Sequence, residues 1–213
     1  MSNIKLVHSG GNSVSLTTPT SNPASNITFK LPQSDGSANQ VLQTDGNGNL
    51  SWVSLPTGGL SMADQWRLTS DLSGSSPNTF ITSNWERVDT AGQGTLGTGM
   101  SESSGVFTFP STGIYKVDFQ FNAYSTSSVR YVGARIQVTT DNNTYTIVSD
   151  SSDGIYVPAT SSWGTSQTSS LIDVTDTSNV KVKFNYYGHG SVTFAGSSTQ
   201  NRTFVTFIRL GDT

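Results

Sequence analysis

The chain holds two histidines, His8 and His189, the residue type most often used as a general acid or base near neutral pH. His189 stands in the segment Tyr187-Gly-His-Gly190, whose glycines are typical of a turn. A nucleophilic triad would need a serine and an aspartate to converge on this imidazole, and no Gly-x-Ser-x-Gly motif marks a nucleophile elbow. We therefore expect His189 to be an exposed turn residue without a catalytic role.

Paired carboxylates would be the machinery of a glycosidase. The candidates are Glu86, Glu102, Asp150 and Asp153. Glu86 begins the segment Glu86-Arg-Val-Asp89, which favours cross-strand contacts with basic neighbours. No repeat of the β-helical kind that carries many such enzymes is visible. We expect that this protein is not an enzyme.

Hard oxygen ligands for a calcium ion occur in three predicted loops, at residues 141–143, 150–154 and 173–176. None of these loops has the ligand spacing of an EF-hand. Asp, Asn, Ser and Gly also form ordinary turns, because their side chains bond to nearby backbone groups or tolerate positive φ. We expect no cofactor, with bound calcium as the alternative.

Two aromatic residues lie in a segment rich in Ser and Thr, where a place in a core is hard to arrange. Trp163 stands in Ser161-Ser-Trp-Gly164, and Tyr156 lies upstream. An aromatic ring on a polar loop is a candidate contact for a receptor or partner, including a glycan on which it could stack. The alternative for Trp163, which its context favours, is a loop anchor that folds back onto the protein.

The composition indicates which elements must position these residues. Of the 213 residues, 35 are Ser, 29 Thr and 15 Asn, whereas only 12% are charged and none is Cys. The net charge of -3 and the absence of a basic patch exclude a nucleic-acid partner, and no apolar run reaches the length of a membrane span. The start of the sequence has no apolar segment of a signal peptide. Abundant β-branched and aromatic residues predict an all-β protein.

Residues 1–56 form short strand-like pieces separated by turns. The predicted strands cover residues 4–7, 13–16, 26–31, 41–44 and 50–53. Asp45-Gly-Asn-Gly-Asn49 is a strong hairpin signal between the last two. Because such hairpins cannot stand alone in water, this region is either a flexible tail or, as we favour, a small β stem in which several chains pack together. Residues 57–63 read as a linker.

Residues 64–213 are predicted to form a head domain of ten strands with the spacing of a β-sandwich. These strands cover residues 65–69, 85–89, 105–109, 114–122, 132–138, 144–148, 170–174, 180–186, 191–194 and 202–210. The last strand is apolar on both faces, with Phe204, Ile208 and Leu210 opposite Val205 and Phe207. A strand covered on both sides is central, and another subunit is the simplest source of the second cover.

The segment from Phe107 through Gly113 and Tyr115 to Phe119 resembles the complement-type globular head domain, a ten-strand jelly roll related to tumour necrosis factor (TNF). Val117 stands where that family usually has Phe. The final strand, 202–210, resembles the family's last strand, which packs near a trimer axis. The resemblance implies a homotrimer. We predict that its interface includes Tyr115, Phe119, Phe204, Phe207 and Ile208.

Residues 30–52 resemble a stem repeat of phage tail fibres and other phage structural proteins, notably those of marine and cyanobacterial hosts. Residues 84–99 are similar to heads in such proteins. The resemblance implies a virion protein assembled in the host cytoplasm, either a short tail fibre or a capsid decoration (cement) protein. Its expected partners are other virion proteins and a glycan of the host surface, and the alternative is a non-viral, lectin-like binding module. The predicted anchoring residues are Ile4, Leu6, Val14, Leu16 and Phe29.

Overall fold

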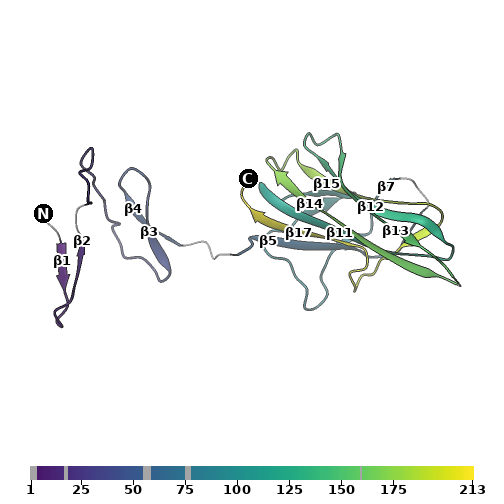
Figure 1. The fold of residues 1–213 in the computed structure, drawn as a ribbon, viewed down its shortest axis with the longest axis horizontal. Helices are drawn as coiled ribbons and strands as arrows, with labels where there is room; N and C mark the ends of the chain where they lie inside the picture. Colours follow the sequence, from purple (N-terminus) through teal and green to yellow (C-terminus); the bar gives the residue numbers. More distant parts are fainter. Residues whose placement is uncertain (1–3, 17–18, 55–58, 75–77, 159) are drawn as a thin grey trace. The chain divides into compact units, whose positions relative to one another are not determined.

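The computed structural model describes residues 4–16, 19–54, 59–74, 78–158 and 160–213. Every regular element in these ranges is a β-strand, which confirms the all-β prediction. The same ranges contain no helix that could cross a membrane. The chain divides into two compact units, Met1–Gly58 and Gly59–Thr213 (Figure 1). We call them the N-terminal unit and the head.

The N-terminal unit consists of two separate antiparallel hairpins. Its strands are β1 (Ile4–Val7), β2 (Ser13–Leu16), β3 (Gln40–Thr44) and β4 (Leu50–Ser54). β1 pairs with β2, and β3 pairs with β4. The β3–β4 turn is closed by Asp45, whose carboxylate accepts bonds from the backbone of Asn47 and Asn49. The predicted hairpin at this turn is confirmed.

The predicted strand at residues 26–31 is wrong. In this segment only Lys30 makes a β-bridge, to Asn49, through two backbone bonds of 2.8 and 2.9 Å. Ile27, Phe29 and Leu31 alternate as the prediction required, but their side chains stay largely exposed. Alternation alone did not produce a strand here, because a strand also needs a neighbour to pair with along its length.

The head contains thirteen strands in its described residues, three more than predicted. One sheet, here the β11 sheet, holds β5 (Met62–Leu68), β6 (Leu72–Gly74), β8 (Trp85–Arg87), β11 (Gly113–Ser125), β14 (Ser162–Val174), β16 (Val192–Phe194) and β17 (Phe204–Gly211). The other, the β12 sheet, holds β7 (Thr79–Phe80), β9 (Ser101–Ser103), β10 (Val106–Thr108), β12 (Val129–Thr139), β13 (Thr146–Ile155) and β15 (Lys181–Gly188). The short strands β6, β7 and β9 are the additions. β5 begins at Met62, inside the predicted linker 57–63, whereas residues 57 and 58 lie outside the described ranges.

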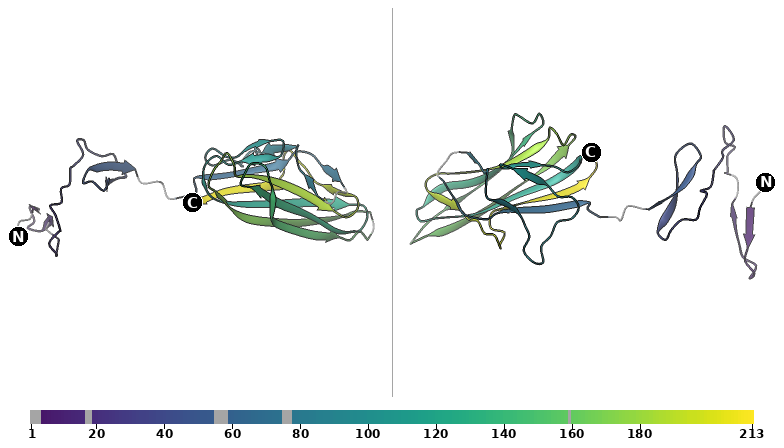
Figure 2. Two further views of the ribbon diagram at one scale, coloured as in Figure 1. Left: turned by 90° about the horizontal axis from the view of Figure 1, so that it is seen from above. Right: turned by 180° about the vertical axis from the view of Figure 1, so that it is seen from behind.

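The strand order places the last strand in the middle of the β11 sheet. β17 pairs with β5 on one side and with β11 on the other, and β14 pairs with β11 along thirteen residues. In the β12 sheet the order is β13-β12-β15-β10-β9. The two sheets form the two layers of a sandwich (Figure 2), an arrangement that buries one face of each sheet.

The core lies between the two sheets and is rich in aromatic rings. Along β11 the side chains alternate between buried and partly exposed over the whole strand. Phe107 contacts Trp85, Phe184 and Phe207 with ring centroids 5.3–5.4 Å apart, a spacing typical of favourable aromatic pairs. The predicted core faces of β11, β12 and β15 are confirmed.

β13 is twice as long as predicted, and β14 is more than twice as long. The sequence missed parts of both strands in which few inward positions carry an apolar residue. Ser149 and Ser151 of β13 face inward, as do Ser166 and Thr168 of β14, all at least half-buried. Ser149 and Thr168 share a hydrogen bond, and Ser149 also donates to the carbonyl of Ser169 at 2.9 Å. We call this line of side chains the hydroxyl seam. Ser149 and Thr168 satisfy each other in this way, whereas the buried Oγ of Ser151 has no hydrogen-bond partner. A seam of hydroxyls produces no hydrophobic alternation that a sequence could show.

Candidate interaction surfaces

The outward side of the β11 sheet is the first candidate surface, and we call its part on β5, β17, β11 and β14 the β17 face. Residues that are directly opposite on neighbouring strands point to the same side of a sheet. Ile208 lies opposite Lys116 and Ala63, and Phe204 lies opposite Gln120 and Arg67. Since Arg67 is itself buried, the accessible part of the face combines apolar Phe204 and Ile208 with polar Lys116 and Gln120.

Three of the five predicted interface residues are inaccessible to another chain. Tyr115, Phe119 and Phe207 are fully buried inside a single head. The interface prediction is therefore wrong for these three residues, because their side chains point from β11 and β17 into the core. Phe204 and Ile208 occupy the outward phase and are partly exposed, so these two stay as interface predictions.

Exposed Leu171 extends the β17 face beyond the sequence prediction, and exposed Leu210 lies where a register shift interrupts the pairing of β17 with β11. Leu171 of β14 is 66% exposed and lies opposite Lys116, and Leu210 of β17 is 50% exposed. Lys116 and Asp118 form an ion pair at 3.1 Å on the same face. The sequence already placed Leu210 on the Phe204 side of the strand. The sequence did not single out Leu171, because Ser169 and Asp173, the outward residues next to it on β14, are polar.

A buried arginine holds one edge of the β11 sheet together. The side chain of Arg67 is fully buried and donates to Glu86 at 2.7 Å, to Asp89 at 2.8 Å and to Thr90 at 2.8 Å. It also donates to the carbonyl of Ser198. The cross-strand contact predicted for Glu86 is confirmed, whereas the burial of Arg67 had no sequence signal. A buried charge with this many partners is a structural feature.

The carboxylates considered for catalysis are engaged in structural hydrogen bonds. Glu102 accepts from the backbone of Gly105 at 2.6 Å, and Asp153 accepts from the backbone of Gly154 at 2.8 Å. Asp150 binds Arg135 at 2.7 Å and accepts a hydrogen bond from the Tyr187 hydroxyl at 2.5 Å. Burial of the phenol, followed by the hydrogen bond to this carboxylate, raises the pKa of Tyr187 to about 12.

The two histidines belong to different units. His8 accepts a hydrogen bond from the backbone of Gly10 at 3.0 Å. His189 follows β15, and its ring lies 5.9 Å from that of Tyr131. Neither contact supplies a nucleophile.

Two of the three predicted calcium loops form turns, whereas residues 150–154 lie inside β13 and were wrongly predicted as a loop. Asp141 accepts hydrogen bonds from the hydroxyl of Thr139 at 2.7 Å and from the backbone of Thr144 and Asn143. These bonds, that from Thr139 most of all, hold the pKa of Asp141 far below its usual range. Asp176 closes its turn in the same way, by accepting from Ser178 and Asn179. Among the described residues, no group of three or more acidic or histidine side chains could hold a metal ion.

Trp163 lies on a strand, whereas the sequence placed it in a loop. It is 54% exposed on β14 and pairs with Tyr124 of β11, their ring centroids 4.8 Å apart. Tyr156 lies just after β13 and is 77% exposed. Both rings are available to a partner, and the loop-anchor alternative does not describe Trp163, whose contact is a cross-strand one.

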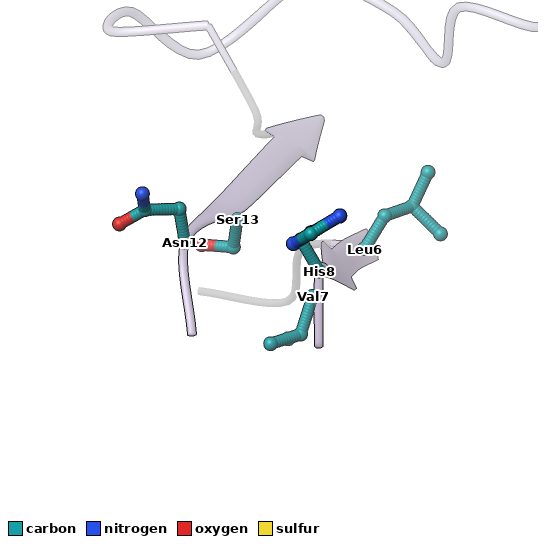
Figure 3. Close-up of a pocket in the computed structure, with 5 residues that line it drawn as sticks. All are labelled: Leu6, Val7, His8, Asn12 and Ser13. Atoms are coloured by element: carbon teal, nitrogen blue, oxygen red, sulfur yellow. The ribbon is translucent and has the colours of Figure 1, made fainter. Parts of the chain in front are cut away.

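The N-terminal unit carries most of its large apolar side chains on the outside. Ile4, Leu6, Leu16 and Phe29 are 65, 68, 72 and 64% exposed. Nothing is described for the side chain of Val14. Figure 3 shows Leu6 and Val7 pointing away from the β1–β2 hairpin, beside an open hollow that also has His8 in its wall. Among the residues of this unit whose exposure is described, none is fully buried.

One part of the N-terminal unit does have internal packing. The Trp52 indole covers Gly36, where a Cβ atom would come within 2.6 Å of the ring. The same indole donates from Nε1 to the carbonyl of Ser34 at 3.0 Å. Residues preceding β3 are thus held against the β3–β4 hairpin.

No model of a protein family matches the sequence, and no curated protein matches it. Solved structures do match the head. One is TNF-like Eiger from S. frugiperda, with a TM-score of 0.52 and 12% identity over 73% of this chain and 96% of that one. Another is murine APRIL at pH 5.0, with a TM-score of 0.51 and 11% identity over 70% of this chain and 98% of that one.

The head is a TNF-like jelly roll. The likeness extends over nearly the whole length of the matched chains, and at this level of identity it shows the fold alone. The expected jelly-roll fold of the head is confirmed. What such a jelly roll does depends on its surfaces.

Proposed function

We propose that this chain is a structural and binding protein of a bacteriophage virion. It acts as a homotrimer whose N-terminal unit anchors to other virion proteins, while the TNF-like head projects. In a short tail fibre the N-terminal unit would bind the tail, and in a decoration protein it would bind the capsid. The resemblance of residues 30–52 to phage stem repeats supports this proposal, as does the jelly-roll fold of the head.

The observation that carries the proposal is the exposed apolar surface of the N-terminal unit. Four of its large side chains, Ile4, Leu6, Leu16 and Phe29, are each almost two thirds exposed or more. Burying each one against a partner is worth about 1.5–3 kcal/mol. Short hairpins gain independent stability only when their apolar face is covered. The unit is therefore suited to a bound state, against other copies of the stem or against another virion protein.

The β17 face supports the trimer. β17 is central in its sheet, with Val205 and Phe207 buried inward and Phe204 and Ile208 facing outward. Exposed Leu171 lies on the same side, opposite Lys116. A central strand with apolar residues on both faces is expected where a second layer covers the sheet, and in the proposed trimer that layer is a neighbouring head.

Localisation on purified virions tests the proposal. Gold-labelled antibody against the head should decorate the particles in electron micrographs, and peptides of this chain should occur in the virion proteome. Label on the tail would select the fibre version, and label on the capsid would select the decoration version. Virions without the chain would rule out both.

A further inference from the structure

Four neighbouring strands of the β11 sheet place a row of matched side chains on its outward side. Trp163 of β14 lies opposite Tyr124 of β11, Tyr124 lies opposite Thr193 of β16, and Thr193 lies opposite Ser73 of β6. Three strand spacings make the row roughly 15 Å long. We call these four side chains the aromatic–hydroxyl row. Figure 1 shows β14 beside β11, where the row begins.

The row lies apart from the two residues predicted at the trimer interface. Tyr124 follows Gln120, the partner of Phe204, by four residues along β11, which is roughly 13 Å. At Tyr124 the neighbour of β11 is no longer β17 but β16. The row can therefore have a ligand of its own.

The aromatic end of the row is held in place before any ligand arrives. The rings of Tyr124 and Trp163 meet at 46° with their centroids 4.8 Å apart. The Tyr124 hydroxyl donates to one carboxylate oxygen of Asp71 at 3.1 Å. The other oxygen of Asp71 accepts from the backbone of Gly196 at 2.9 Å. Since Trp163 remains 54% exposed, its indole is a platform with a free face.

The other end of the row is rich in hydroxyls and contains a small cavity. The hydroxyls of Ser73 and Thr193 lie 3.2 Å apart and share a hydrogen bond. The cavity beside them measures about 230 Å³, and its wall includes Tyr124, Thr126 and Ser191. Each hydroxyl can both donate and accept a hydrogen bond, as can each hydroxyl of a sugar.

We propose that the aromatic–hydroxyl row binds a neutral oligosaccharide. The exposed indole of Trp163 stacks against the C–H face of one sugar ring, and Ser73, Thr193 and Asp71 bond to hydroxyls of the next. An aromatic surface beside hydrogen-bonding groups suits a ligand with an apolar face and a polar edge. No Lys or Arg occurs among the described residues that line the row and its cavity, so an anionic glycan would find no counter-charge there.

This inference rests on the proposed function, because it names the ligand class of the projecting head. It can fail while the virion proposal holds, since localisation on particles does not depend on Trp163. Conversely, a chain absent from virions could still bind sugar through the row. The two tests are therefore separate.

The experiment is calorimetric titration of the full chain with maltopentaose, cellopentaose, N-acetylated chitopentaose and the anionic pentagalacturonate. We expect at least one neutral oligosaccharide to bind and the anionic one not to bind. Trp163→Ala should weaken that binding roughly tenfold or more, the scale of losing one stacked aromatic ring. Trp163→Phe, which keeps a ring, should lose less. Absence of binding to all three neutral oligosaccharides would overturn the proposal.

The matched control is Tyr131→Ala, which removes an exposed aromatic ring from the β12 sheet. It should bind like the unaltered chain. Light scattering and thermal melting of each variant complete the test. If Trp163→Ala binds sugar normally, the row is not the site. If it instead changes the oligomeric state, the row is a contact between chains and the proposal is wrong.

Discussion

The head and the N-terminal unit use the same kinds of residue in opposite ways. In the head, apolar side chains such as Phe107 and Phe207 are completely buried in one shared core. In the N-terminal unit, Leu6 and Phe29 are more than half exposed, and order comes from turns such as the one at Asp45. The head has a core of its own, whereas we propose that the N-terminal unit is completed by a partner.

The largest expected difference between the units is the effect on the melting of the head when an aromatic residue of each unit is replaced by Asp. Phe207→Asp buries an unpaired charge in the head core and removes an aromatic ring, which should cost more than about 4 kcal/mol and unfold the head. Phe29→Asp should leave the melting of the head unchanged. Circular dichroism melts of both variants measure this. A folded Phe207→Asp head would contradict the assigned core.

A second substitution to Asp, on the β17 face, distinguishes the role of that face from the role of the core. Ile208→Asp should leave the head folded, because Ile208 points outward, yet dissociate the proposed trimer by burying charge between chains. Light scattering should then give the mass of one chain, compared with three for the unaltered protein. Tyr131→Asp on the other sheet is the control and should remain trimeric. If the Ile208→Asp variant remained trimeric, the trimer interface would not include Ile208.

Buried and exposed ion pairs of the head should contribute differently to its free energy of unfolding. Arg67→Met removes a fully buried guanidinium and leaves Glu86 without its partner, which should cost about 2–3 kcal/mol. Lys116→Met breaks a pair on the surface with Asp118 and should cost less than about 1 kcal/mol. Urea unfolding gives both values. Equal losses would mean that burial of Arg67 contributes nothing.

The smallest effect compares two turns, one in each unit. The hydrogen bonds that Asp141 and Asp45 accept lower both of their folded-state pKa values below the ordinary 3.8. Each turn therefore adds stability above pH 3.8 that is lost as the pH falls further. Asp141→Asn should make the melting of the head less sensitive to acid, and Asp45→Asn should not. Acid titrations of both variants followed by circular dichroism give the comparison, and identical profiles for Asp141→Asn and the unaltered chain would contradict it.

The sequence predicted those strands in which apolar residues alternate with polar ones, such as β11 and β15. It missed the second half of β13 and the first part of β14. In these segments the side chains of the hydroxyl seam, which are Ser and Thr, occupy inward positions. It also predicted a strand at residues 26–31, where alternation occurs without a pairing neighbour. Hydrophobic alternation therefore predicts a strand only where a neighbouring strand pairs with it and a second layer covers one of its faces.

The interface prediction shows a second limit. Alternation groups Phe204 with Ile208 and Val205 with Phe207, but it does not say which group faces inward. That choice is made by the β12 sheet, which covers one side only. Likewise, the pairing of Trp163 with Tyr124 joins residues about forty positions apart, and it follows from sheet register, which no local pattern encodes.

The position of β17 between β5 and β11 has a consequence for how the protein is made. β5 and β17 are paired at residues such as Gln65 and Thr206, which are 141 positions apart. Until the ribosome has delivered β17, the β11 sheet remains in two halves, so the head cannot close while its earlier strands emerge. Closing such a long loop is slow.

The N-terminal unit is synthesised before the head can fold. During that interval its exposed Leu6, Leu16 and Phe29 are free to meet other nascent chains, which is a recognised route to aggregation. Neighbouring ribosomes on one message would supply the same sequence, so this interval is also when stems of identical chains are most concentrated. Synthesis order would then favour association through the stem first and consolidation of the heads afterwards.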